Sequence, residues 1–132
     1  MSATFAERLN HLFETVYPPG RGRHTSAEVI SALRAEGITI SAPYLSQLRS
    51  GNRTHPSPGT ITALASFFRI KPEYFTDDKY YRKLDKELTW LANMRDEGVR
   101  RIAARTVGLS REAQDTLAAT ADELRRKEHL SD

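Results

Sequence analysis

Residues 41–75 read SAPYLSQLRSGNRTHPSPGTITALASFFRIKPEYF, and this stretch decides the fold. A serine cap, a proline in the first turn and a closing glycine predict a helix over residues 41–50. Ser57 followed by Pro58 predicts a second helix that runs to about residue 68. A third helix of about one turn is expected from residue 71. The stretch therefore predicts three helices joined by tight turns.

The same stretch carries no acidic side chain. No Asp or Glu occurs between Gly37 and Pro72, whereas four basic residues do: Arg49, Arg53, Arg69 and Lys71. Residues 1–76 hold 8 basic and 5 acidic residues, and residues 77–132 hold 12 of each, so the net charge of +3 belongs to the first part. A compact, basic helical surface favours a polyanion. We expect double-stranded DNA as the partner.

Helical periodicity continues on both sides of this stretch. Apolar residues at helical spacing predict a helix over about residues 4–16. Thr25 and Glu28 have the spacing of a capping box, which predicts a helix that closes at Gly37. Beyond residue 77, apolar stripes predict three more helices, the last of them capped by Ser110. Because no segment has the period of a strand, we expect an all-α protein.

The first part of the chain resembles the DNA-binding domain of the Cro/C1 (lambda-repressor-like, XRE) family. The similarity covers about residues 5–75, and the residues that carry it are Tyr44-Leu45-Ser46-Gln47-Leu48-Arg49-Ser50-Gly51-Asn52-Arg53, Pro56 to Ala65, and Ile70-Lys71-Pro72-Glu73-Tyr74-Phe75. The resemblance implies a five-helix domain whose second and third helices form a helix-turn-helix. The whole chain also resembles the EspR-type family of mycobacterial transcription regulators. That resemblance implies a DNA-binding domain over residues 1–76 and a helical dimerisation domain over residues 77–132.

In the Cro/C1 family the third helix enters the major groove, and its first residues meet base edges. The resemblance therefore implies base contacts by Ala42, Pro43, Tyr44 and Gln47. The Gln47 amide can pair with adenine, but Ala42 and Pro43 offer no side-chain hydrogen bond. We therefore expect a relaxed sequence preference, with much of the affinity coming from phosphates. The alternative is that Tyr44 and Gln47 are surface residues with no role in binding.

Contacts with the DNA backbone are expected from polar and basic residues around this helix. They are Arg21, Arg23, Thr25, Ser41, Ser46, Arg49, Asn52, Arg53, Thr54 and His55. The Arg21-Gly22-Arg23 loop has three interpretations that stay open: insertion into a narrow minor groove, phosphate contact, or a solvated charged turn. For each serine, a helix cap or a solvated face is at least as good an interpretation as a backbone contact.

The helices beyond residue 77 carry wide apolar stripes and balanced charge. Two copies of the chain could pair these stripes in a helical bundle, and we expect such a homodimer, with higher assembly left open. The interface residues expected are Tyr81, Leu84, Leu88, Leu91, Leu117 and Leu124. The alternative is that these helices fold back on the first domain.

Other classes of function find less support in the sequence. The chain has no cysteine, its four histidines are dispersed, and no nucleophile–base pair stands out, so we expect no catalytic, metal or cofactor site. No signal peptide or apolar run of membrane-spanning length is present, and we expect a cytoplasmic, nucleoid-bound protein. The leading hypothesis is a dimeric transcription regulator with a relaxed sequence preference, and nucleoid association and DNA bridging are left open. The other is an antitoxin-like module that binds a protein partner through its C-terminal helices.

Overall fold

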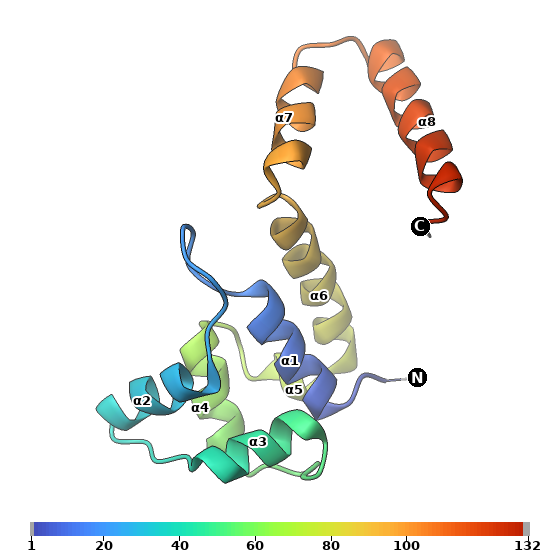
Figure 1. The fold of residues 1–132 in the computed structure, drawn as a ribbon. Coiled ribbons are helices and arrows are strands. Elements are labelled where there is room, and N and C mark those ends of the chain that lie inside the picture. The colour runs from blue at the N-terminus through green and yellow to red at the C-terminus, as the bar shows by residue number, and fades with distance from the viewer. Residues whose placement is uncertain (1, 131–132) are drawn as a thin grey trace. The chain divides into compact units, whose positions relative to one another are not determined.

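The computed structural model describes residues 2–130, which form eight α-helices and, within that range, no strand (Figure 1). This confirms the all-α prediction. The chain divides into two compact units, Met1–Asn93 and Met94–Asp132. The first unit contains α1 (Phe5–Thr15), α2 (Ser26–Ala35), α3 (Ala42–Ser50), α4 (Pro58–Phe68), α5 (Glu73–Thr76) and α6 (Asp78–Asn93); the second contains α7 (Glu97–Thr106) and α8 (Arg111–Lys127).

The helices begin at the residues that the sequence marks as caps. Thr4 and Thr25 each form a complete capping box, with Glu7 and Glu28 respectively. The hydroxyls of Ser41, Ser57 and Ser110 each accept a hydrogen bond from the amide three residues ahead. These bonds satisfy amides that have no partner inside the helix, so they fix where each helix starts.

Three helices of the first unit close at a residue in the left-handed conformation. Gly37 closes α2 with φ 82°, as predicted. Gly51 closes α3 with φ 85°, as its position in the sequence predicts. Arg69 closes α4 with φ 58°, where a glycine is usual. The backbone amide of Arg69 bonds back to carbonyls of the last turn of α4. The turn is therefore made by an L-residue that bears the steric cost of this conformation.

The core of the first unit brings its six helices together. Helix α1 packs against α3, α5 and α6, and α2 packs against α3 and α4. Leu45 and Leu48 of α3 are fully buried and form the inner face of this helix. The other buried apolar residues are Leu9, Leu12, Phe13, Val29, Ile30, Leu33, Ile40, Ala63, Leu64, Ala65, Phe68, Tyr74 and Phe75. With two leucines as its inner face, α3 keeps its opposite face at the surface.

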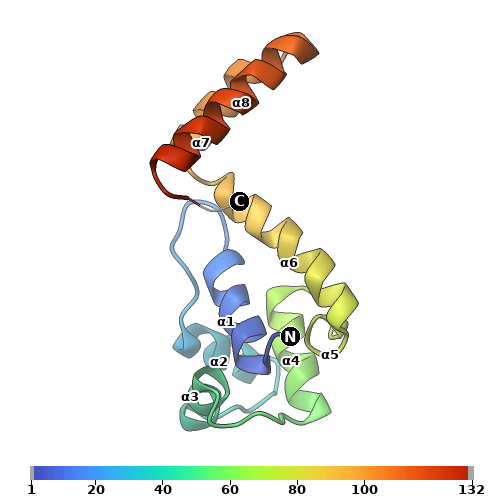
Figure 2. The same ribbon diagram turned by 90° about the vertical axis from the view of Figure 1, so that its right-hand side faces the viewer.

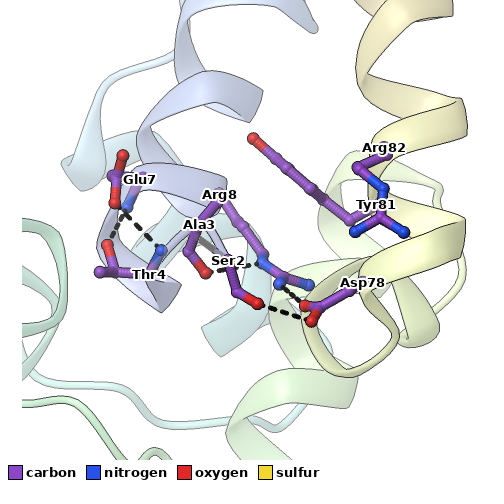
Figure 3. A pocket seen from close by; sticks show the side chains of 8 residues that line it. All are labelled: Ser2, Ala3, Thr4, Glu7, Arg8, Asp78, Tyr81 and Arg82. Carbon is purple, nitrogen blue, oxygen red and sulfur yellow. Dashed lines mark hydrogen bonds and ion pairs between the residues drawn. The ribbon is translucent and has the colours of Figure 1, made fainter.

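A buried arginine joins α1 to the start of α6 (Figure 3). Arg8 is only 4% exposed, forms an ion pair with Asp78 and donates to the carbonyl of Tyr74 (3.1 Å). The Tyr74 hydroxyl returns a hydrogen bond to the carbonyl of Arg8 (2.8 Å), and the guanidinium lies 4.5 Å from the centre of the Tyr81 ring. A hydrogen bond from the Ser2 hydroxyl and the bond from Arg8 hold the pKa of Asp78 below its ordinary value. These contacts attach α6 to the first unit.

Helix α6 continues this packing along its length. Tyr81, Leu84 and Leu88 are half-buried and lie against the core of the first unit, and the Tyr81 ring is 5.0 Å from that of Tyr74. By packing, α6 therefore belongs to the first unit, although the sequence analysis assigns it to the second domain. The functional division at residue 76 stays a prediction, as does the use of these three residues in a dimer.

The second unit contains well-formed helices but almost no interior. Neither α7 nor α8 has a buried residue. Asp96 and Ser110 cap the two helices, and the Gln114 amide donates to the carbonyl of Thr106 (3.1 Å), which links them. Large apolar side chains are exposed along both: Val99, Ile102, Val107, Leu109, Leu117, Leu124 and Leu130.

Candidate nucleic-acid interface

Helix α3 presents the residues for which base contacts are predicted. Ala42 and Pro43 are exposed in its first turn, and Tyr44 and Gln47 are half-buried beside them. Ser46 is exposed on the same helix. The two buried leucines anchor the inner face of the helix in the core. Helix α3 lies at the edge of the first unit (Figure 2). We call Ala42, Pro43, Tyr44 and Gln47, together with Arg53, the α3 edge.

Arg53 belongs to this edge because it folds back onto α3. Its backbone amide donates to the carbonyl of Gln47 (3.1 Å), and its Nε donates to the Gln47 side-chain oxygen Oε1 (2.9 Å). Its guanidinium also lies 5.6 Å from the centre of the Tyr44 ring. The left-handed turn at Gly51 reverses the chain and makes this return possible. Sequence reasoning places Arg53 in the following loop and does not predict its contact with Gln47.

The rest of that loop is exposed. Asn52, Thr54 and His55 all face solvent, and the Thr54 hydroxyl is 2.8 Å from Nδ1 of His55. Ser41 combines exposure with a structural role, because its hydroxyl caps α3 through the amide of Tyr44 (3.2 Å). The structure thus gathers Ser41, Ser46 and residues 52–55 around the α3 edge.

Arg49 takes a different position from the one expected of a backbone contact. Its Nε donates to Asn10 Oδ1 (2.8 Å) and its Nη1 to the Ser26 hydroxyl (2.9 Å), while its guanidinium lies 3.8 Å from the centre of the Phe13 ring. The Asn10 amide donates in turn to the carbonyl of Arg49 (2.9 Å). Burial lowers the pKa of Arg49. The side chain therefore joins α1, α2 and α3 instead of standing free at the surface.

The loop between α1 and α2 extends away from α3 (Figures 1 and 2). Arg21 is held by both carboxylate oxygens of Glu28 (2.8 and 2.6 Å), and His24 Nδ1 is 3.1 Å from the same group. The bonds from Arg21 and His24 lower the pKa of Glu28 to about 2. Thr25 caps α2, whereas Arg23 is exposed and has no polar partner within residues 2–130. The structure does not bring this loop together with the α3 edge.

The start of α3 and the start of α4 share an electrostatic property. Every other helix among the described residues has an acidic side chain in its first turn, whereas α3 and α4 have none. The partial positive charge of their amino-terminal ends is therefore not neutralised, and such ends attract anions. A surface groove beside them is lined by residues that include Thr39, Ser57 and Thr60. The acid-free segment thus combines positive helix ends with hydroxyl donors.

Other kinds of site are not apparent in the part of the chain that the structure describes. Within residues 2–130 no three His, Asp or Glu side chains are grouped so that they could hold a metal ion. None of the helices in that range is both long enough and apolar enough to cross a membrane. The α3 edge and the residues around it remain the strongest candidate site.

The fold and the site together define a class: an all-α protein with an exposed, acid-free helix edge on its first unit and exposed apolar helices in its second. No family model matches the chain. Two curated relatives from Mycobacterium tuberculosis, strains CDC 1551 / Oshkosh and ATCC 25618 / H37Rv, are both named nucleoid-associated protein EspR. Each is 72% identical over 130 residues, which cover 98% of this chain and 98% of the relative. The chain belongs to the EspR family, which confirms the resemblance of the whole chain.

Proposed function

We propose that this protein is a dimeric, DNA-binding transcription regulator of the nucleoid. The observation that carries the proposal is the exposed α3 edge, which lies in a segment of 36 residues, 37–72, without an acidic side chain. In this proposal the first unit acts as a Cro/C1-type helix-turn-helix domain, α3 lies in the major groove, and the positive ends of α3 and α4 meet phosphates. The relatives named nucleoid-associated protein support a chromosomal role.

The chemistry of the α3 edge supports a relaxed sequence preference. Ala42 and Pro43 can contact a thymine methyl group but offer no side-chain hydrogen bond. One good bidentate pair discriminates between bases by about 1–3 kcal/mol, and this edge offers at most one or two. Most of the affinity then comes from phosphate contacts, for which the candidates nearby are Ser41, Ser46, Asn52, Thr54 and His55. Such a protein would coat many sites instead of selecting one operator.

The second unit supports self-association. A segment of this size builds a marginal core at best, and here the helices α7 and α8 bury no side chain of their own. Leu117 (45% exposed) and Leu124 (52% exposed) lie on α8, and Leu91 (53% exposed) lies at the end of α6. Pairing these surfaces in a second copy would cover them. A homodimer would also carry two α3 edges, which raises the effective concentration on DNA and allows two sites to be bridged.

The same exposed surface carries the alternative function, an antitoxin-like module that binds a different protein. The exposed apolar side chains of α7 and α8 fit a foreign partner as well as a second copy. Light scattering on the purified full chain separates the two. A stable dimer with no other component supports the regulator, whereas a monomer that becomes ordered only with a second protein supports the alternative.

An acidic substitution in α3 tests the DNA-binding proposal directly. Ala42→Glu places a carboxylate in the first turn of α3, where it should stabilise the fold by about 0.3–1 kcal/mol through the helix dipole. The same carboxylate would repel phosphates, so binding to duplex DNA should fall steeply. Ala32→Glu on the exposed side of α2 makes the same charge change outside the acid-free segment and serves as the matched control.

The measurement is fluorescence anisotropy on random and AT-rich duplexes over a range of salt concentrations. The wild-type protein should bind both duplexes, and its affinity should fall as the salt concentration rises. A plot of the logarithm of the affinity against the logarithm of the salt concentration should fall with a slope of about 0.9 per phosphate contact. Equal binding by the Ala42→Glu variant and the wild-type protein would remove α3 from the interface. A wild-type protein that binds no duplex at low salt would end the DNA-binding proposal.

A further inference from the structure

We infer that Gln47 and Arg53 act as one recognition unit, which reads guanine in preference to adenine at the base that α3 meets. The inference rests on the proposed DNA-binding function and goes beyond it, because it assigns a base preference to a named pair of side chains. It also gives Arg53 a role in the groove in place of the phosphate contact expected from the sequence.

The first step is that Arg53 is held at the α3 edge by three separate contacts. Its backbone amide bonds to the Gln47 carbonyl (3.1 Å), its Nε bonds to Gln47 Oε1 (2.9 Å), and its guanidinium lies 5.6 Å from the centre of the Tyr44 ring. The backbone bond and the left-handed Gly51 fix the chain, so the side chain starts from a set position. Arg53 is therefore placed beside Gln47 before any DNA arrives.

The second step concerns the hydrogen-bonding groups that remain. A glutamine pairs bidentately with adenine when its oxygen accepts from the N6 amino group and its nitrogen donates to N7. Here the Gln47 oxygen already accepts from Arg53. One lone pair of that oxygen stays free, and the other free groups of the pair, the Gln47 side-chain NH₂ and the two Nη groups of Arg53, are all donors. Donors therefore outnumber acceptors in the pair, and the guanidinium adds a positive charge.

The third step matches these donors to the bases. In the major groove guanine presents two acceptors, N7 and O6, whereas adenine presents one acceptor and one donor. The donors of the pair can serve both acceptors of guanine, whereas against adenine the charged Nη donors of Arg53 meet the amino group, which is also a donor. A single bidentate contact of this kind discriminates by about 5- to 160-fold between the right and the wrong base. The expected preference is for guanine at one position of each half-site, on an otherwise tolerant surface.

The fourth step is the consequence of removing Arg53. The Arg53→Ala variant removes the Nη donors and leaves both lone pairs of the Gln47 oxygen free, so the Gln47 amide alone faces the base with a donor and an acceptor. The preferred base at that position should then change from guanine to adenine. Loss of a phosphate contact would instead weaken binding to all sequences alike. Because Arg53 is exposed, the substitution leaves the core intact.

The experiment selects duplexes with a randomised core and compares the full-length wild-type protein with Arg53→Ala, Gln47→Ala and the control Arg69→Ala. Arg69 is an exposed arginine at the end of α4. We expect the wild-type protein and the control to enrich guanine at one position, Arg53→Ala to enrich adenine there, and Gln47→Ala to lose at least about 5-fold of the discrimination. Enrichment of adenine by the wild-type protein, or uniform weakening by Arg53→Ala with the preference unchanged, would overturn the inference.

A measurement without DNA separates this inference from the proposed function. The side-chain amide resonances of Gln47, recorded by NMR on the free protein, should shift in Arg53→Ala and stay in place in Arg69→Ala. Unshifted resonances in Arg53→Ala would show that the pair does not form and would overturn the inference even if DNA binds. If the resonances shift in Arg53→Ala but the wild-type protein binds no duplex, the pair forms and the DNA-binding proposal is refuted instead.

Discussion

Replacing Arg49 by methionine should destabilise the first unit while leaving the number of phosphate contacts unchanged. Arg49 donates to Asn10 Oδ1 (2.8 Å) and to the Ser26 hydroxyl (2.9 Å), and its guanidinium lies 3.8 Å from the centre of the Phe13 ring. Methionine preserves the apolar stem of the side chain but removes all three contacts. The variant therefore tests whether this arginine joins helices or binds DNA.

The magnitude follows from these contacts. A hydrogen bond to a charged group contributes about 1.5–3 kcal/mol, and a cation–π contact contributes about 0.5–2 kcal/mol. Burial opposes the charge, as the lowered pKa of Arg49 indicates, so the net loss is smaller than the sum. We expect a loss of about 2–3 kcal/mol in the free energy of unfolding. For comparison, Arg23→Met removes an exposed arginine that has no polar partner within residues 2–130, and it should change stability by less than about 0.5 kcal/mol.

Urea denaturation of the full chain measures the loss, and the salt dependence of DNA binding measures the phosphate contacts. If Arg49 positions α3, Arg49→Met lowers stability and affinity, and the salt slope stays the same. If Arg49 contacts a phosphate, stability changes by less than about 1 kcal/mol and the slope falls by about 0.9. That second result would refute the reasoning. Arg49→Lys keeps the positive charge but loses the planar fork of donors. If Arg49 contacts a phosphate, this variant should keep the salt slope of the wild-type protein. If Arg49 joins the helices, it should lose stability as Arg49→Met does.

Three further predictions follow from other parts of the molecule. Arg69→Gly should raise the free energy of unfolding by about 0.5–1 kcal/mol, because glycine adopts the left-handed end of α4 without steric cost; an unchanged urea midpoint would contradict this. The pKa of Glu28 is lowered to about 2, so its contacts with Arg21 and His24 contribute stability above the ordinary pKa near 4.5, and that contribution is lost as the pH falls toward 2. Glu28→Gln should therefore reduce the loss of stability between about pH 4.5 and pH 2, as measured by thermal unfolding at a series of pH values. An unchanged pH profile would argue against these contacts. Leu117→Asp with Leu124→Asp should convert the expected dimer to a monomer in sedimentation analysis, whereas the exposed Thr116→Asp should not.

The starts and ends of most helices could be predicted from the sequence because they depend on neighbouring residues. Ser41 and Ser57 cap α3 and α4 through an amide three residues away, and Gly51 ends α3 by a backbone preference of its own. Such contacts are set by spacing alone. The inward face of α3 was equally predictable, because two leucines at helical spacing leave little choice.

The positions of the arginines could not be predicted in the same way. Arg49 meets Asn10, which is 39 residues away along the chain, and Arg53 reaches Gln47 only because the chain reverses at Gly51. In the sequence, both arginines are predicted to contact phosphates because they are charged. Only the packing of α1 against α3 shows that Arg49 joins helices whereas Arg53 stays at the surface. Arg69 at the left-handed end of α4 has no sequence signal, because that position favours glycine.

The apolar stripe of α6 shows a second limit. Tyr81, Leu84 and Leu88 lie against the first unit, whereas Leu91 at the end of the same helix is exposed. A helical repeat of apolar residues predicts that one face of the helix will be covered, but it does not identify the helix or chain that covers it. The stripe is compatible with an intramolecular neighbour and with a second copy, so the pattern alone could not assign the four residues to one of these.

If a second copy covers α7 and α8, as proposed, their lack of buried side chains would link the survival of this unit to the abundance of the protein. A folding step that requires a second copy depends on protein concentration, so dilution shifts the equilibrium toward unpaired chains. Helices without a covered face open readily, and proteases cleave such segments first. Chains that fail to pair would therefore be degraded sooner than paired ones. Turnover would remove the protein that is not assembled and would keep the pool in its paired form.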